Sequence, residues 1–204
     1  MIARAAAAAS LRNRRRKLKL FLDFIDPTEE TTVVDVGVAD APFGAGEGQA
    51  LTHNFFEALY PWPQRITAVG NVPLEHFAQA FPQIPRVVAD GRELPFAQGE
   101  FDVAFSNAVV EHVGGRADQE RFVHELCRIA DRVFVTTPNR HFPIDPHTLL
   151  PFLHWLPERA RPHALDGIRP LSPREFRSLF PYPVRIVNTG LTLIAVGGRA
   201  PSAE

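Results

Sequence analysis

A chain of 204 residues is long enough for one domain with a sizeable core, whereas two halves would each bury too little surface. Apolar residues make up 45% and charged residues 22%, as in ordinary globular proteins. No apolar run approaches the roughly 18 residues that a membrane span needs. The net charge is −1, and the acidic balance beyond residue 25 disfavours a nucleic-acid enzyme, which needs a positively charged face. We therefore expect a single domain over residues 1–204 that does not bind nucleic acid.

The N-terminal segment 1–27 predicts a basic amphipathic helix. Its Ala-rich beginning is followed by basic residues, which is the reverse of the order in a signal peptide, so we expect a cytoplasmic protein. Apolar residues recur at helical spacing from Leu11 to Ile25, and Asp26-Pro27 ends the pattern. The first 25 residues hold 7 of the 22 basic residues. Two interpretations stay open: a solvated face on a helix that caps a ligand crevice, or peripheral contact of residues 11–25 with an anionic membrane.

Short apolar strands then alternate with helices. This alternation predicts an α/β protein whose parallel strands are covered on both faces by helices. The predicted strands are 32–37, 66–69, 86–89, 101–106 and 132–135, and the predicted helices are 54–59, 73–81, the latter with proline at its start, and 119–130.

The C-terminal third has a different composition. There are ten prolines between Pro138 and Pro183, so long regular elements are excluded, yet the segment is too apolar for a disordered linker. We interpret residues 138–171 as an ordered lid rich in proline, histidine and aromatic residues. Ser172 and Pro173 predict the start of a helix. Two last strands, 184–187 and 191–196, are joined by a tight turn and predict an antiparallel hairpin, which brings the sheet to seven strands.

Polar or small residues stand where the predicted strands end. They are Asp35-Val36-Gly37, Asp90-Gly91, Ser106-Asn107 and Thr136-Thr137. In a doubly wound sheet, ligands bind beyond the carboxyl ends of the strands. These residues are therefore the candidate ligand-binding groups.

Three segments give the chain a resemblance to a known family. They are Val33-Val34-Asp35-Val36-Gly37, then Asp90-Gly91-Arg92-Glu93-Leu94-Pro95-Phe96, and Phe101-Asp102 with the later Glu111-His112. In these segments, over about residues 28–139, the chain resembles the class I S-adenosylmethionine-dependent methyltransferases, and within them the type 11 group that methylates small molecules. The resemblance implies a Rossmann-like, doubly wound, mostly parallel seven-stranded sheet with an antiparallel C-terminal hairpin.

The resemblance also implies a cofactor site for S-adenosylmethionine. The backbone of the Asp35-Val36-Gly37 turn would approach the methionine part, and Asp90 would accept the adenine amino group beside Gly91. Ser106 and Asn107 would line the cofactor near its reacting methyl group. For Asp35 the alternative is a buried carboxylate that only braces the loop, and for Asp90 it is a turn or cap residue.

Two departures from the family pattern affect this site. The first turn continues as Val38-Ala39-Asp40-Ala41 without further glycines, and the later glycines at 44, 46 and 48 indicate an insertion. The second strand runs into Gly70-Asn71, where the family has an acid that binds the ribose. Asn71 can still hydrogen-bond a ribose hydroxyl, although the lost charged hydrogen bond costs about 1.5–3 kcal/mol. A degenerate methyltransferase fold that senses the cofactor or acts as a scaffold is therefore the alternative function.

The sequence leaves the acceptor and its chemistry open. A general base is needed only if the acceptor must lose a proton, and the candidates are His112, His141 and His147. For His112 the alternative is a helix residue that orients a neighbouring loop. The aromatic lid favours a small, apolar or lipid-like acceptor, with ordinary packing as the alternative. No metal site is expected, because the histidines lack ligand spacing. Cys127 is expected to be a small core residue.

Overall fold

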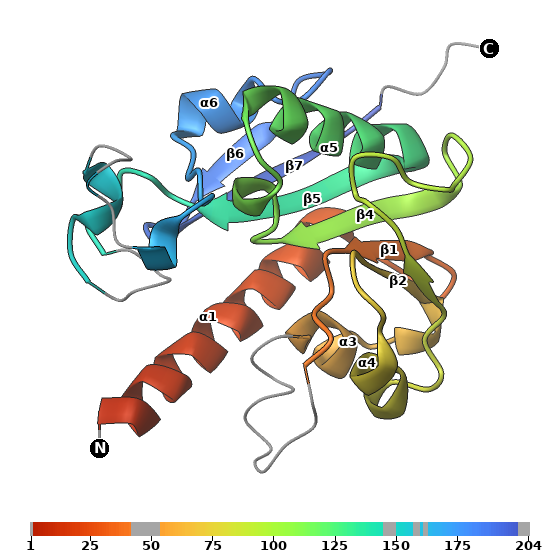
Figure 1. The fold of residues 1–204 in the computed structure, drawn as a ribbon. Coiled ribbons are helices and arrows are strands. Elements are labelled where there is room, and N and C mark those ends of the chain that lie inside the picture. The colour runs from red at the N-terminus through yellow and green to blue at the C-terminus, as the bar shows by residue number, and fades with distance from the viewer. Residues whose placement is uncertain (1, 42–53, 145–149, 157–159, 161–162, 200–204) are drawn as a thin grey trace. The chain divides into compact units, whose positions relative to one another are not determined.

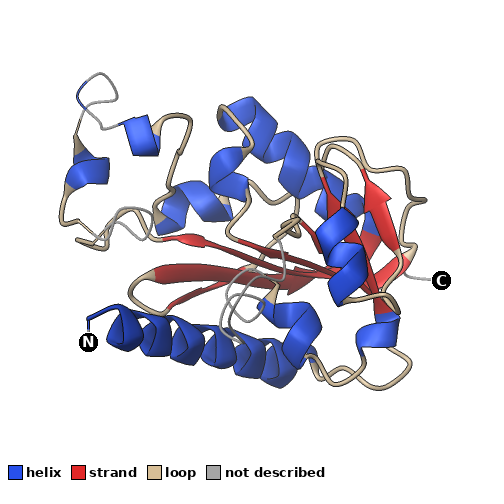
Figure 2. Cartoon of the chain, turned by 60° about the horizontal axis from the view of Figure 1, so that its bottom comes forward, coloured by secondary structure: helices blue, strands red, loops and turns tan. Residues whose placement is uncertain are grey.

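The computed structural model describes residues 2–41, 54–144, 150–156, 160 and 163–199. The chain forms two compact units, Met1–Asp90 and Gly91–Glu204, and both contain strands and helices (Figures 1 and 2). That the whole chain is one domain stays a prediction. Among the described residues, no helix combines the length and the apolar character that crossing a membrane requires.

The first unit begins with α1 (Ile2–Ile25), the predicted basic helix, which is a single straight rod (Figures 1 and 2). Its buried side includes Leu18, Phe21 and Ile25, whose spacing puts them on one face. Phe21 packs edge-on against two aromatic rings of the next helical segment. The helix ends where Asp26 has a φ of 48° and Pro27 follows. Four basic side chains are exposed at the spacing i, i+3, i+4, i+7, which places them on one helical face: Arg12, Arg15, Arg16 and Lys19.

Three parallel strands form the sheet of the first unit in the order β3-β2-β1. They are β1 (Val33–Val36), β2 (Ile66–Gly70) and β3 (Arg86–Val88), with Val33 opposite Ile66 and Ala68 opposite Arg86. Every residue of β1 is buried: three are the valines that predict a buried strand, and the fourth is Asp35. Along the chain, the helix α3 (Phe55–Leu59) and the 3-10 turn η1 (Pro63–Arg65) come between β1 and β2, and the helix α4 (Glu75–Ala80) comes between β2 and β3.

The prediction that a proline begins the helix of residues 73–81 is wrong. α4 begins at Glu75, with Leu74 at the N-cap position, so Pro73 lies before the helix. The physical reason lies in the loop after β1: the Asp40 carboxylate accepts a hydrogen bond from the N–H of Phe77, and this contact fixes the first turn of the helix.

The second unit holds four strands in the order β4-β5-β7-β6. β4 (Phe101–Asn107) and β5 (Ala130–Pro138) are parallel, whereas β7 (Thr192–Gly198) is antiparallel both to β5 and to β6 (Arg185–Asn188). The predicted C-terminal hairpin and the count of seven strands are therefore confirmed. α5 (Arg116–Ile129) lies against β4 and β5, and α6 (Pro173–Arg177) lies against β6 and β7.

Two boundaries in this unit differ from the prediction. α5 begins at Arg116 rather than Gln119, because Gly115 is the N-cap residue and its N–H donates to Asp118. β5 begins at Ala130, directly after the helix, and extends past Val135, because β7 pairs with it as far as Pro138.

The core of the second unit lies between its sheet and α5. The rings of Phe105 and Phe134 stack with their centroids 5.8 Å apart. Cys127, on α5, is buried as expected, and this burial raises the pKa of its thiol to about 11. A thiol in this state is a poor nucleophile, so Cys127 serves as a core residue.

Candidate functional site

In the first unit, the end of β1 holds a pair of buried carboxyl groups. Asp35 and Glu57, on α3, are only 6% and 3% exposed, and their side chains are hydrogen-bonded to each other. Burial raises the pKa of Asp35 well above its ordinary value, and the neighbouring charge of Glu57 raises it further. Burial also raises the pKa of Glu57. Both carboxyl groups therefore lie in surroundings that disfavour their ionised forms.

The turn that follows β1 is held by backbone and side-chain contacts. Gly37 has a φ of 108°, a conformation that glycine adopts without strain. Its N–H and that of Val38 both donate to the carbonyl of Val69, at 2.8 and 3.1 Å. The buried side chain of Asn54 makes two hydrogen bonds to Ala39: its Oδ1 accepts from the backbone N–H at 3.0 Å, and its Nδ2 donates to the carbonyl at 2.8 Å.

Asp40 fixes the other end of this turn to α4. Its Oδ1 accepts from the N–H of Phe77 at 2.8 Å, and its Oδ2 lies 2.9 Å from Nδ1 of His76. Desolvation acts to raise the pKa of Asp40, but the hydrogen bonds from Phe77 and His76 lower it overall. The residues from Gly37 to Asp40 are therefore fastened at three places in the first unit: to β2, to α3 and to α4.

The ends of β2 and β3 carry the remaining predicted residues of the first unit. A Cβ added to Gly70 would lie 2.8 Å from Leu74 Cδ2 and 3.3 Å from the carbonyl oxygen of Val38, so glycine permits the close approach of the two strand ends. Asn71 and Asp90 are exposed. Val36 is buried at the end of β1, so only its backbone is available to a ligand.

In the second unit, polar side chains at the ends of β4 and β5 are bonded to one another. Ser106 is buried, and the side chain of Asn107 accepts a hydrogen bond from Thr136 Oγ1 at 2.9 Å. Thr137 Oγ1 donates to Oε2 of the buried Glu111, at 3.0 Å. Glu111 belongs to the 3-10 turn η2 (Val110–His112), and its backbone carbonyl accepts from the N–H of Arg169. Gly91, the first residue of this unit, is partly exposed.

The three candidate histidines have different surroundings. The side chain of His112 is 44% exposed, and its Nε2 lies 3.8 Å from Glu111 Oε1. His141 is exposed, and its backbone N–H donates to Asn139 Oδ1. His147 lies outside the described residues. Among the residues that the structure describes, no group of three potential metal ligands occurs.

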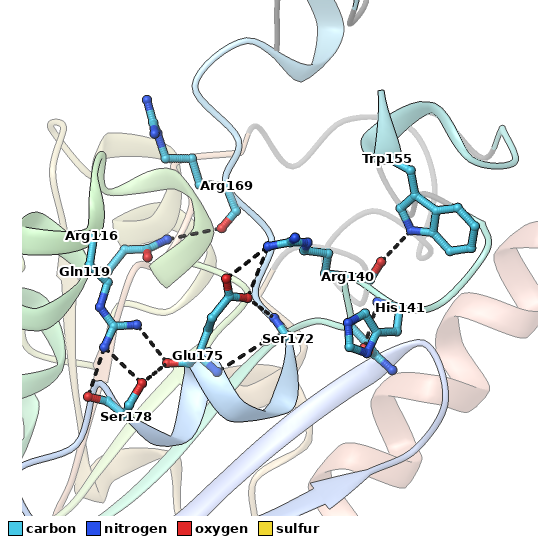
Figure 3. A network of polar contacts seen from close by, with 10 residues as sticks. Arg116, Gln119, Arg140, His141, Trp155, Arg169, Ser172, Glu175 and Ser178 are labelled. Atoms are coloured by element: carbon cyan, nitrogen blue, oxygen red, sulfur yellow. Dashed lines mark hydrogen bonds and ion pairs between the residues drawn. The ribbon is translucent and has the colours of Figure 1, made fainter. Parts of the chain in front are cut away.

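The segment after β5 is joined to α6 by an extended set of polar contacts (Figure 3). Arg140 forms an ion pair with Glu175 at 3.0 Å, its backbone carbonyl accepts from Trp155 Nε1, and its N–H donates to Leu171. The described part of the lid contains only short turns, η3 (Leu153–Trp155) and η5 (His163–Leu165), as its prolines predict. Large apolar side chains of this region are exposed: Ile144, Leu150, Phe152, Trp155 and Leu156.

Sequence reasoning missed two buried residues: Asn54, which contacts the turn after β1, and Glu57, which contacts Asp35 at the end of β1. One signal was present: Glu57 interrupts the apolar run Phe55-Phe56-Glu57-Ala58-Leu59, where an acid on a buried helix needs a partner. The partner itself could not be read from the sequence, because the contact joins residues that are 22 positions apart.

Comparisons with known proteins agree with the predicted resemblance. A family model described as a methyltransferase domain matches residues 43–132. No curated protein matches the sequence. Among solved structures, the chain is similar to the Burkholderia thailandensis 1,6-didemethyltoxoflavin-N1-methyltransferase, which was crystallised with S-adenosylhomocysteine. The identity is 17% and the TM-score 0.58, over 92% of this chain and 78% of the other.

Two further structures cover most of both chains. A putative methyltransferase bound to the Trm112 activator of Haloferax volcanii has 16% identity and a TM-score of 0.61, over 96% and 94% of the two chains. The N-methyltransferase NodS of Bradyrhizobium japonicum, in complex with S-adenosylhomocysteine, has 14% identity and a TM-score of 0.60, over 93% and 87%. The predicted Rossmann-like fold and the resemblance are confirmed, and the domain match implies S-adenosylmethionine as the cofactor.

Proposed function

We propose that this chain is an S-adenosylmethionine-dependent methyltransferase and that it methylates a small acceptor of apolar or lipid-like character. Its fold and its match to a methyltransferase domain support this proposal. When bound, S-adenosylmethionine supplies an activated methyl group on a sulfonium cation. The chain's own residues then bind the donor, orient the acceptor and exclude water. In such a displacement, positioning accounts for most of the acceleration.

The residues at the strand ends fit this donor. It carries a positive charge and an adenosine but no phosphate, so carboxyl groups suit it better than a phosphate-binding loop. In the first unit, Asp35 and Glu57 supply acidic groups at the end of β1, and Glu57 Oε1 is buried with no hydrogen-bond partner among the described residues. Such an atom is costly unless a hydrogen-bond donor reaches it.

The roles of individual residues follow the resemblance. In the first unit, the backbone of Val36 and Gly37 is proposed to contact the methionine part of the donor, Asn71 a ribose hydroxyl and Asp90 the adenine amino group. In the second unit, the backbone of Gly91 is proposed to lie beside the adenine, and Ser106 and Asn107 to lie near the methyl group. The side chain of Asp35 bonds Glu57, so we assign it to the support of the turn.

The observation that supports an apolar acceptor is the composition of the exposed lid. Phe152 and Trp155 are each 51% exposed and lie 4.9 Å apart between ring centroids. Exposed aromatic pairs of this kind are typical of surfaces that bind apolar molecules. If the acceptor must lose a proton, His112, His141 or His147 is proposed as the base.

The exposed basic face of α1 supports peripheral contact of residues 11–25 with an anionic membrane. Each cation near such a surface contributes about 1 kcal/mol at most. Flotation with phosphatidylserine vesicles would detect this contact. Binding that is unchanged after neutralisation of Arg12, Arg15 and Arg16 would contradict it.

The first test of the function is isothermal titration with S-adenosylmethionine and with S-adenosylhomocysteine. We expect binding in the micromolar range. Asp90→Ala should abolish or strongly weaken it, because the exposed carboxylate is the proposed adenine acceptor. If the wild-type protein binds neither ligand, the chain is a degenerate relative that acts as a scaffold. If it binds both ligands and Asp90→Ala binds equally well, the assignment of Asp90 is wrong.

A further inference from the structure

α3 is a short helix whose two buried polar side chains contact the end of β1 and the turn after it. Asn54, at the N-cap position, bonds the backbone of Ala39, and Glu57, one turn further on, bonds Asp35. Both side chains are more than nine-tenths buried. Neither contact follows from the needs of the helix itself.

Asn54 does not serve its own helix. Asparagine at this position ordinarily accepts a hydrogen bond from a backbone N–H of the first turn. Here its side chain makes no such bond, and both ends of the amide are used on Ala39 instead. The stabilisation of α3 that a cap provides is absent, and the turn gains two hydrogen bonds.

Burying the carboxyl group of Glu57 at this position costs free energy of folding. A buried carboxyl group beside another one must share a proton or suffer repulsion. The neighbouring strand β2 contains no ionisable residue. An apolar residue of similar size would fill the same space without this cost. A role for the carboxyl group at the turn explains its presence.

α3 is itself firmly supported. Phe56 and Tyr60 stack on each other at 4.9 Å, and Phe21 of α1 packs against both rings. Within the turn Gly37–Asp40, only Gly37 has a positive φ. The shape of the turn therefore depends on the groups that fasten it more than on glycine flexibility.

We propose that Asn54 and Glu57 are positioning residues, which hold the turn Gly37–Asp40 in the shape that the methyl donor requires. This proposal rests on the proposed function, because the turn is its expected donor site. Both residues act through the backbone and through Asp35, and they need not touch the donor.

The test is titration of folded variants with S-adenosylhomocysteine. We expect Asn54→Ala to weaken binding about tenfold or more, since it loses both hydrogen bonds to Ala39. Glu57→Ala should weaken binding as well, since Asp35, directly before the turn, loses its buried partner. Glu57→Gln should bind within about threefold of the wild-type protein, because its amide can hydrogen-bond Asp35 in place of the Glu57 carboxyl group. The control is Ser172→Ala, which removes the N-cap of α6 in the second unit and should leave the affinity unchanged.

The pH profile separates positioning from general destabilisation. The wild-type affinity should fall as the pH rises, because two neighbouring buried carboxyl groups then ionise, whereas that of Glu57→Gln should fall less, because only Asp35 is left to ionise. Failure of the wild-type protein to bind would refute the proposed function itself. Wild-type binding together with unchanged affinity in Asn54→Ala would overturn the positioning role of Asn54, and equal pH profiles would overturn that of Glu57. If Glu57→Ala does not fold, the other two variants decide.

Discussion

The turn after β1 and the segment after β5 are both fastened to a short helix, but by different kinds of contact. The side chains at the turn are buried almost completely: Asn54 bonds Ala39 in the turn, and Glu57 bonds Asp35 directly before it. The segment is joined to α6 by Arg140 and Glu175, whose side chains are 50% and 44% exposed. Exposed ion pairs contribute little and are screened by salt, whereas unsatisfied buried groups are costly.

This difference matches the proposed roles of the two regions. The proposed methyl donor is the same molecule in every reaction cycle, so a rigid turn can be complementary to its shape. The acceptor side, near the lid, is held more loosely at its surface, although the buried Asn139 anchors its beginning through hydrogen bonds to Gly190 and His141. Changes in the turn should therefore have larger effects than changes in the segment.

The largest effect is expected for Gly37→Ala. A φ of 108° is strained for any residue with a Cβ, so stability should fall by about 1–3 kcal/mol, and the affinity for S-adenosylhomocysteine should fall too. Urea unfolding and titration measure both quantities. Gly115→Ala is the matched control, because its φ is −74° and an added Cβ would meet Asp118 only at 3.9 Å. Equal stability losses in the two variants would show that the turn is not strained.

The second effect concerns the dependence of stability on pH. The pKa values of Asp35 and Glu57 are raised in the folded protein above the unfolded values near 4. The folded state therefore holds a proton that the unfolded state has released. The stabilisation is fully present below about pH 4 and is lost as the pH rises through the raised values.

Unfolding by urea at about pH 6 and about pH 9 checks this prediction. The wild-type protein should lose more stability across this range than Glu57→Gln, which keeps only one of the two buried carboxyl groups. Other ionisable groups, such as His163, are common to both proteins and cancel in the comparison. A larger loss in Glu57→Gln would show that the pair is not protonated.

A smaller effect is expected for Ser172→Ala. Ser172 accepts from the N–H of Glu175, and the Glu175 carboxylate accepts from the N–H of Ser172, which together form a capping box. Its loss should cost about 1 kcal/mol of stability. The melting temperature should fall while the affinity for S-adenosylhomocysteine is kept. Weaker binding in this variant would mean that α6 supports the donor site.

The smallest effect is expected for Arg140→Ala. The exposed pair with Glu175 is worth about 0–1 kcal/mol, and this contribution should shrink in high salt. Thermal unfolding in low and high salt measures it. The hydrogen bond from Trp155 goes to the backbone of Arg140 and is kept in the variant. A loss above about 2 kcal/mol would exceed what an exposed pair contributes and would remove the contrast between the two regions.

The order and the type of the regular elements could be predicted from the sequence. Short runs rich in valine and other apolar residues predicted the strands: β1 holds three valines beside Asp35 and is buried throughout. Local signals gave the ends: Asp26-Pro27 stops α1, Ser172-Pro173 starts α6, and the turn before β7 produces the antiparallel hairpin. These features depend only on residues that are close together in the sequence, so the local sequence is enough to predict them. The predicted first residues of α4 and α5 were wrong, because the contact between Asp40 and Phe77 sets the start of α4 and the N-cap residue Gly115 sets that of α5.

Only the tertiary structure decided how the polar residues at the strand ends are used. The sequence placed Asp35 at the end of a strand, but whether its side chain faces a ligand or a partner depends on Glu57, 22 residues further on. Asn54 looks like an ordinary N-cap residue until the fold brings Ala39 to it. A buried polar group takes whatever partner the packing supplies, and that partner is set by the path of the backbone between distant segments.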